Sequence, residues 1–339
     1  MNPQIYAEWL RRQGQRVVST ASSYWHSEGM GIFQAFPYHW LIEPAAEELK
    51  HLTSRHRAMV LRYCMPAEIT PAETIPPESM LAPARPAQRF PRNTEEGAGY
   101  HTVCTALDYG FQNLGAKTRH HTRHSLRQCA VGPIAFDRYE AEGWPLRVDT
   151  LDRQRRRLHE SRADWRKRCL AAADLKGFEI WAAQVDTRLA ATLLIFRMDD
   201  WYYLLYQQCH RAYLGKHVNN ALTFAVTRAL LDRPGVRGIY YGMRSLDAPA
   251  SVDEFKFHMG YLRRPVRERI VFHPAIVPLV NRFSHQWLRT AKKIAPRQRW
   301  LAKAEALVRR SLAEKSADTT PPALACESVP QSRVLELKL

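Results

Sequence analysis

The sequence predicts an α/β fold, in which a mixed sheet is flanked by helices. Before residue 66 the pattern runs strand, helix, strand. From residue 178 onward it runs strand, strand, strand, helix, strand, helix, strand. Such alternation is typical of α/β domains. A chain of 339 residues, 45% of them hydrophobic, is long enough for one large domain or two smaller ones.

Residues 1–65 are expected to form a partial α/β unit. Residues 15–21 (QRVVSTA) and 57–65 (RAMVLRYCM) have the apolar character of strands. Between them, residues 43–53 (EPAAEELKHLT) indicate a helix. Pro44 suits the first turn of that helix, where a backbone N–H is not needed.

A proline-rich stretch separates this unit from the rest of the chain. Residues 66–99 contain seven prolines, and proline sustains neither a helix interior nor a central strand. We therefore expect an extended linker there. The tail, residues 316–339, is expected to be disordered.

The clearest strand signals lie between residues 178 and 209. Residues 178–186 and 188–198 predict a β-hairpin, and the aromatic run at 201–209 (WYYLLYQQC) predicts the next strand. Apolar residues at helical spacing predict a helix over residues 219–232, with Asn219 or Asn220 as its cap. The remaining expected elements are helices at 114–130, 150–173 and 252–259 and strands at 131–136, 236–243 and 261–272.

This order of elements, with these residues, resembles the second half of a GNAT domain, and its FemAB-like branch in particular. The likeness covers residues 111–275. It is carried by three stretches, NLGAKTRHHTRHSLRQCAV, LAATLLIFRMDDWYYLLYQQCHRAYLGKHVNNALTFAVTRALL and GIYYGMRSLDAPASVDEFKFHMGYLRRPV. The resemblance implies a GNAT-like acyltransferase domain over residues 100–275. It also allows a tandem, in which residues 1–65 are a second, partial GNAT-like unit.

The resemblance implies acyl-CoA, such as acetyl-CoA, as co-substrate. In this fold the coenzyme pyrophosphate lies at a helix start, and the acyl group lies where two strands splay apart. The usual phosphate loop, R/Q-x-x-G-x-G/A, corresponds here to residues 214–219, with His217 and Asn219 at the glycine positions. The residues expected to bind the coenzyme are Tyr206, Gln207, Gln208, Arg211, Gly215, Lys216, His217, Asn219 and Asn220.

Three residues are the candidate catalytic groups. In Fem-type ligases a Lys that follows a Phe lies near the transfer centre, which implies that Lys256 stabilises negative charge. Lys256 stands where GNAT domains commonly have a Tyr. Glu254 is a candidate base for the amine, and Tyr241 a candidate acid for the leaving thiolate. The alternative interpretation is a solvated surface charge for Lys256 and Glu254, and core packing for Tyr241.

The charge balance favours anionic partners. Fifty Lys and Arg residues against 33 Asp and Glu residues give a formal net charge of +17. Arg119, Arg123 and Arg127 lie on a basic helix and are expected to bind an anionic substrate or tRNA, although a solvated face would look the same. His120 and His124 share a face of that helix, but with no third ligand apparent we expect no metal site.

The C-terminal helices, at 276–294 and 297–314, are basic and amphipathic. One apolar stripe comprises Trp300, Leu301, Ala304, Leu307, Val308 and Leu312. It suits packing on the body, or peripheral attachment of residues 276–315 to an anionic membrane. With no long apolar stretch, no signal segment and no paired cysteines, we expect a cytoplasmic protein without a transmembrane segment.

Three functions follow from these observations. The first is an N-acyltransferase that moves an acyl group from acyl-CoA to an amine acceptor of unknown identity by direct attack. The second is a Fem-type aminoacyltransferase that uses aminoacyl-tRNA. The third is a non-catalytic, GNAT-derived module that binds RNA or a membrane.

Overall fold

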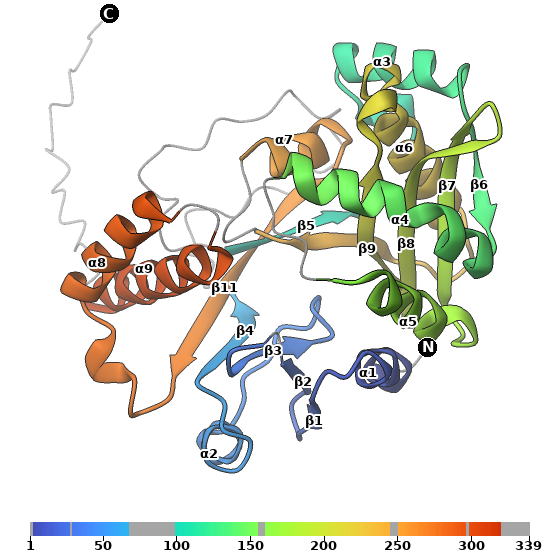
Figure 1. Ribbon diagram of the computed structural model, residues 1–339. Coiled ribbons are helices and arrows are strands. Elements are labelled where there is room, and N and C mark those ends of the chain that lie inside the picture. The colour runs from blue at the N-terminus through green and yellow to red at the C-terminus, as the bar shows by residue number, and fades with distance from the viewer. Residues whose placement is uncertain are drawn as a thin grey trace, which may run out of the picture.

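The computed structural model describes residues 3–27, 29–67, 99–154, 160–244, 250–295 and 298–319 (Figure 1). Its strands are β1 (Val17–Ser19), β2 (Tyr24–Ser27), β3 (Ile32–Phe36), β4 (Val60–Pro66), β5 (Gly99–Cys104), β6 (Ala130–Ile134), β7 (Phe178–Val185), β8 (Arg188–Met198), β9 (Trp201–Cys209), β10 (Gly238–Met243) and β11 (Leu262–Phe272). Its α-helices are α1 (Pro3–Arg12), α2 (Ala46–Ser54), α3 (Ala116–Leu126), α4 (Phe136–Arg153), α5 (Arg162–Ala173), α6 (Val218–Leu231), α7 (Ala250–His258), α8 (Arg282–Ile294) and α9 (Arg299–Thr319).

All these strands belong to one mixed sheet, in the order β1-β2-β3-β4-β11-β5-β10-β9-β8-β7-β6. Two of its neighbouring pairs are parallel, β3 with β4 and β9 with β10, and each encloses a helix in the chain, α2 or α6. β5 pairs with β10 and β11, whereas β11 pairs with β4 and β5. β11, the last described strand in the chain, therefore lies beside β4 of the N-terminal unit. This mixed sheet confirms the predicted fold class.

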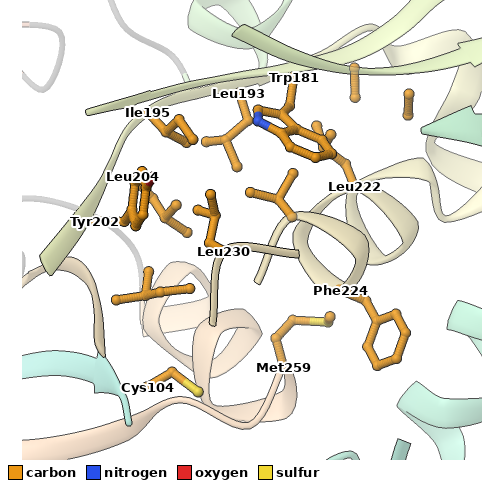
Figure 2. Close-up of a cluster of buried hydrophobic side chains, with 14 of the residues drawn as sticks. Cys104, Trp181, Leu193, Ile195, Tyr202, Leu204, Leu222, Phe224, Leu230 and Met259 are labelled. Atoms are coloured by element: carbon orange, nitrogen blue, oxygen red, sulfur yellow. The ribbon is translucent and has the colours of Figure 1, made fainter. Parts of the chain in front are cut away.

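Two hydrophobic layers cover the faces of the sheet. Successive residues of a strand point to opposite faces, and β8 shows this clearly. Leu193 and Ile195 pack towards α6, whereas Leu194 and Phe196 join the layer that includes residues of α1, α4 and α5. Figure 2 shows side chains of the first layer, where Leu222 and Leu230 of α6 meet the sheet.

Five elements were missing from the sequence prediction: α1, β2, β3, β5 and most of α4. β3 has all five residues buried, so it lacks the alternation that marks a half-exposed strand. The single helix predicted at 150–173 is wrong, because α4 ends at Arg153 and α5 starts after Ser161. Ser161 accepts a hydrogen bond from the Asp164 backbone and so caps α5.

The division into residues 1–65, 66–99, 100–275, 276–315 and 316–339 stays a prediction. Most of the expected linker, 68–98, lies outside the described residues, as does most of the expected disordered tail. The first residues of that tail continue α9 to Thr319 and are helical. Within the described residues, no helix is long and apolar enough to cross a membrane.

Candidate functional site

β9 and β10 diverge beside the start of α6. They pair only where residues 201–203 face residues 238–240. β9 then continues to Cys209, while β10 passes an irregularity at Gly242 and pairs with β5. Gly242 has a φ of 123°, a value that glycine adopts readily. From Leu204 onward this edge of β9 is not paired with β10, which is the divergence that the resemblance implied.

The side chain of Gln207 links the three elements at this divergence. Its Nε2 donates to Oδ1 of Asn219 (3.2 Å) and to Oγ1 of Thr223 (3.0 Å), both on α6. The Tyr241 hydroxyl of β10 donates to Oε1 of Gln207. Burial raises the pKa of Tyr241, so the phenol stays protonated at neutral pH.

Lys256 lies next to this network and is only 7% exposed. Its Nζ is 2.8 Å from Oδ1 of Asp253 and 5.4 Å from the ring centroid of Tyr241. Oδ2 of Asp253 accepts a hydrogen bond from the Tyr100 hydroxyl (2.8 Å). Burial and this hydrogen bond raise the pKa of Tyr100 to about 12. The structure thus provides the carboxylate partner that a buried ammonium group needs.

Helix α6 begins without a side-chain cap and without an acidic residue in its first turn. His217 occupies the cap position in the left-handed conformation (φ 53°), with no side-chain cap and no acidic residue in the first turn. The predicted cap by Asn219 or Asn220 is wrong. Oδ1 of Asn219 accepts from Gln207 instead, and Nδ2 of Asn220 lies 3.7 Å from Sδ of Met259. The positive end of the helix dipole is therefore available to an anion.

His217 also connects the start of α6 to helix α3. Its ring stacks on that of His121, with centroids 3.8 Å apart and planes 6° apart. Burial, and then the charge of His121, lower the pKa of His217, so this imidazole is neutral at pH 7. Lys216 precedes it and is partly exposed, and Gly215 is exposed with open space where a Cβ would lie. His121 was not among the predicted site residues.

Arg211, a predicted phosphate ligand, is engaged elsewhere. Its backbone N–H donates to Oδ2 of Asp149 (2.9 Å), and its guanidinium contacts Asp149 and Asp152 of α4. Burial alone would raise the pKa of Asp149, but hydrogen bonds from Arg153 and Arg211 outweigh it and lower that pKa. The Arg211 side chain is thus held by carboxylates and fixes the loop before α6 to α4.

The predicted β9 residues are divided between the two faces of the sheet. Gln207 points to α6, whereas Tyr206 lies on the other face, where the guanidinium groups of Arg147 and Arg168 are 5.9 and 5.4 Å from its ring centroid. Gln208 is 2% exposed and pairs across the strands with Thr192. Only Gln207 of the three joins the network at the divergence.

The remaining candidates lie apart from the network. Glu254 is exposed on α7, and its neighbour Asp253 makes the contacts with Lys256. Nη2 of Arg119 donates to the carbonyl of Leu114 (3.0 Å), and the guanidinium of Arg123 lies 4.7 Å from the Phe111 ring centroid. Arg127 is exposed at the end of α3.

His120 and His124 of α3 lie side by side along the helix. The rings of His120 and His124 are parallel, with centroids 6.5 Å apart. In the part of the chain that the structure describes, no group of three His, Cys, Asp or Glu side chains is arranged to hold a metal ion.

Comparison with known proteins shows which solved structures this fold is similar to. No protein-family model matches the chain, and no curated protein matches it. FemX aligns with a TM-score of 0.51 and 10% identity, over 80% of this chain and 92% of FemX. L-PGS from Bacillus licheniformis gives 0.46 and 12%, over 82% and 94% of the two chains. A tandem GNAT protein from the clavulanic acid biosynthesis pathway gives 0.41 and 14%, over 76% and 82%. At 10% identity the likeness to FemX shows the fold alone, and the chain has a GNAT/FemAB-like fold.

Proposed function

We propose that this protein is an N-acyltransferase that moves an acyl group from acyl-CoA to an amine by direct attack. One observation carries the proposal. β9 and β10 diverge beside the uncapped start of α6, and the side chains at that divergence are Gln207, Tyr241 and the buried Lys256. A GNAT fold alone would not specify this chemistry, because one fold hosts many functions.

The start of α6 fits a phosphorylated donor. Backbone N–H groups of a first helical turn bind phosphate, and the first turn of α6 contains no acidic residue. Lys216 and the neutral ring of His217 would add a charge and a hydrogen-bonding group beside that turn. When bound, the coenzyme supplies a thioester, which activates the acyl group towards an amine.

The residues at the divergence would act on the reacting groups. The Lys256 ammonium would stabilise negative charge on the acyl oxygen, and burial strengthens that interaction. Tyr241 is protonated and positioned by Gln207, and its hydroxyl would rotate away from Oε1 of Gln207 to donate its proton to the leaving sulfur. Asp253 holds Lys256 in place. The role of Glu254 as base would require an amine that approaches from the solvent side of α7.

Aminoacyl-tRNA is the second candidate donor, as in a Fem-type transferase. The observation that favours it is a group of cations beside the same site. The guanidinium groups of Arg263 and Arg244 lie 5.1 and 5.9 Å from the ring centroid of Tyr100, which contacts Asp253. A polyanion bound there would be held mainly by charge, and its binding would fall steeply with salt.

Thermal shift and turnover measurements separate these donors. Acetyl-CoA or a longer acyl-CoA should raise the melting temperature, since a ligand at one hundred times its Kd stabilises the fold by about 2.7 kcal/mol. Release of the coenzyme thiol should then follow addition of a suitable amine. If tRNA raises the melting temperature and acyl-CoA does not, the donor is aminoacyl-tRNA and not acyl-CoA. Binding of RNA or membranes without any transfer would point to the non-catalytic module.

A further inference from the structure

Helix α8 presents large apolar side chains to solvent. Phe283 and Ile294 are each 80% exposed, and Trp287 is 58% exposed. Their spacing of four and seven residues places them in one stripe along the helix. Leu279, 64% exposed, lies just before the helix in the short turn Val277–Leu279. Single exposed apolar residues are common, but an aligned stripe on one helix marks an interaction surface.

The opposite face of α8 is fixed to α9. Leu288 packs with Val280, Leu301 and Val308. Oε1 of Glu305 on α9 lies 3.1 Å from Nε2 of His285, and its Oε2 lies 3.1 Å from Nζ of Lys292. In Figure 1 the two helices lie on the β11 side of the molecule, away from β6 and β7. The protein body therefore holds α8 with its apolar stripe facing outward.

Cations accompany the stripe. Arg282, Arg289 and Lys293 are exposed, and none forms an ion pair with the described residues. Their spacing of seven and four residues places them along one flank of the stripe. The helix contains no acidic residue. α8 thus combines an apolar stripe with a line of unneutralised positive charge.

We infer that α8 is a membrane-surface helix that docks on anionic phospholipid. Phe283, Trp287 and Ile294 would enter the interfacial region, while the three cations contact lipid phosphates. Trp suits that depth, because its ring is amphipathic. Contact of α8 with a second copy of itself would bring six like charges together, which opposes a dimer through this face. The inference is independent of the proposed function.

Within residues 276–315, the structure places the accessible apolar stripe on α8. The predicted stripe on residues 300–312 belongs largely to the core, since Leu301, Leu307 and Val308 are buried against β11 and α8. Trp300 is 44% exposed, and Ala304 and Leu312 of that stripe are partly buried. The accessible stripe belongs to the preceding helix.

Vesicle co-sedimentation of the full chain tests this inference. The protein should sediment with vesicles that contain phosphatidylglycerol, only weakly with phosphatidylcholine alone, and less as salt is raised. The double variant Phe283→Ser, Trp287→Ser should bind at least about tenfold more weakly. The triple variant Arg282→Gln, Arg289→Gln, Lys293→Gln should lose the preference for anionic lipid.

Matched variants control for general changes. Met30→Ser with Leu107→Ser removes apolar side chains that are 66% and 61% exposed elsewhere, and should bind as the unaltered chain does. Arg166→Gln, Lys167→Gln and Arg188→Gln together remove the same charge from a different surface, and should retain the preference.

Several outcomes would overturn the inference. One is anionic vesicle binding that the α8 variants leave unchanged, and another is no vesicle binding at all. Another is a dimer of the unaltered chain in sedimentation velocity, together with no vesicle binding. If the double variant Phe283→Ser, Trp287→Ser is then a monomer, the stripe binds a second copy of the chain. Salt-sensitive tRNA retention without vesicle binding would assign the cations to RNA.

Discussion

The two halves of the sheet contain the same arrangement, a parallel strand pair with a helix between its strands. β3 and β4 pair over residues 32–34 and 60–62, and β9 and β10 over residues 201–203 and 238–240. Each ladder is three residue pairs long. The halves differ beyond the last pair of each ladder, and this difference locates the candidate site.

In the first half the chain closes the divergence. The backbone N–H of Ile42, in the segment after β3, donates to the carbonyl of Cys64 on β4 (2.8 Å). Arg62, at the last ladder pair, is 5% exposed and donates to Glu268 of β11, which also contacts Arg310 of α9. Polar groups that would face a ligand are paired with one another instead.

The first turns of α2 and α6 also differ in charge. α2 has Glu47 and Glu48 in its first turn, so its dipole is complemented within the chain. α6 has no acidic residue there, and its first turn adjoins Gln207. The comparison teaches that the same scaffold need not give two sites. The first half pairs its polar groups within the sheet, whereas in the second half β9 and β10 separate beside a helix start without acidic residues.

The largest effect should come from Lys256→Ala. Removing a buried ammonium group at the divergence should lower turnover at least about a hundredfold, because charge that develops on the acyl oxygen loses its partner. The measurement is kcat with acyl-CoA and a competent amine. Lys50→Ala, on the exposed face of α2, is the matched change in the first half and should leave turnover unaltered.

Folding must be separated from chemistry in that experiment, because Lys256→Ala leaves the Asp253 carboxylate without its cation. Asp253→Asn keeps the ammonium group but removes its partner, and should give an intermediate loss. Near-normal turnover in a folded Lys256→Ala protein would show that the site lies elsewhere.

Adjacent glutamines on opposite faces of β9 give the next test. Gln207→Leu removes the group that orients Tyr241, and should lower turnover by about tenfold or more. Gln208→Leu should retain turnover. Both amide atoms of Gln208 are buried without a hydrogen-bond partner among the described residues, so its melting temperature should be equal or higher. Equal losses of turnover would contradict the assignment of faces.

Local patterns predicted the second half better than the first, for a physical reason. The hairpin, the aromatic strand and the helix after it are long and strongly patterned, so local sequence is sufficient for β7, β8, β9 and α6. β2 and β3 are short and largely buried, and β5 becomes a strand through its pairing with β10 and β11. Strands fixed by distant partners carry a weak local signal.

The candidate site was predicted in part for similar reasons. Gln207, Tyr241, Lys256 and Asn219, all predicted site residues, lie together in the structure, and their roles stay predictions. The roles of Asp253 over Glu254, and of His121, depend on side-chain direction and on the packing of α3 against α6. Arg211 precedes the loop that corresponds to the phosphate loop, but the Asp149 carboxylate that holds it is distant in sequence and has no local signal.

The smallest and most specific effect concerns the two helix starts. Asn219→Asp adds one negative charge to the first turn of α6 while keeping the oxygen that accepts from Gln207. A carboxylate there stabilises a helix by about 0.3–1 kcal/mol, so the melting temperature should not fall. Acyl-CoA binding should nevertheless weaken about five- to tenfold at low salt, since the charge repels phosphate, and the loss should shrink as salt is added. Glu47→Gln makes the reverse change in α2, and should lower stability slightly without affecting binding. Isothermal titration of both variants measures the contrast. If the two helix starts respond alike, the coenzyme phosphates do not bind at α6 and the distinction between the halves fails.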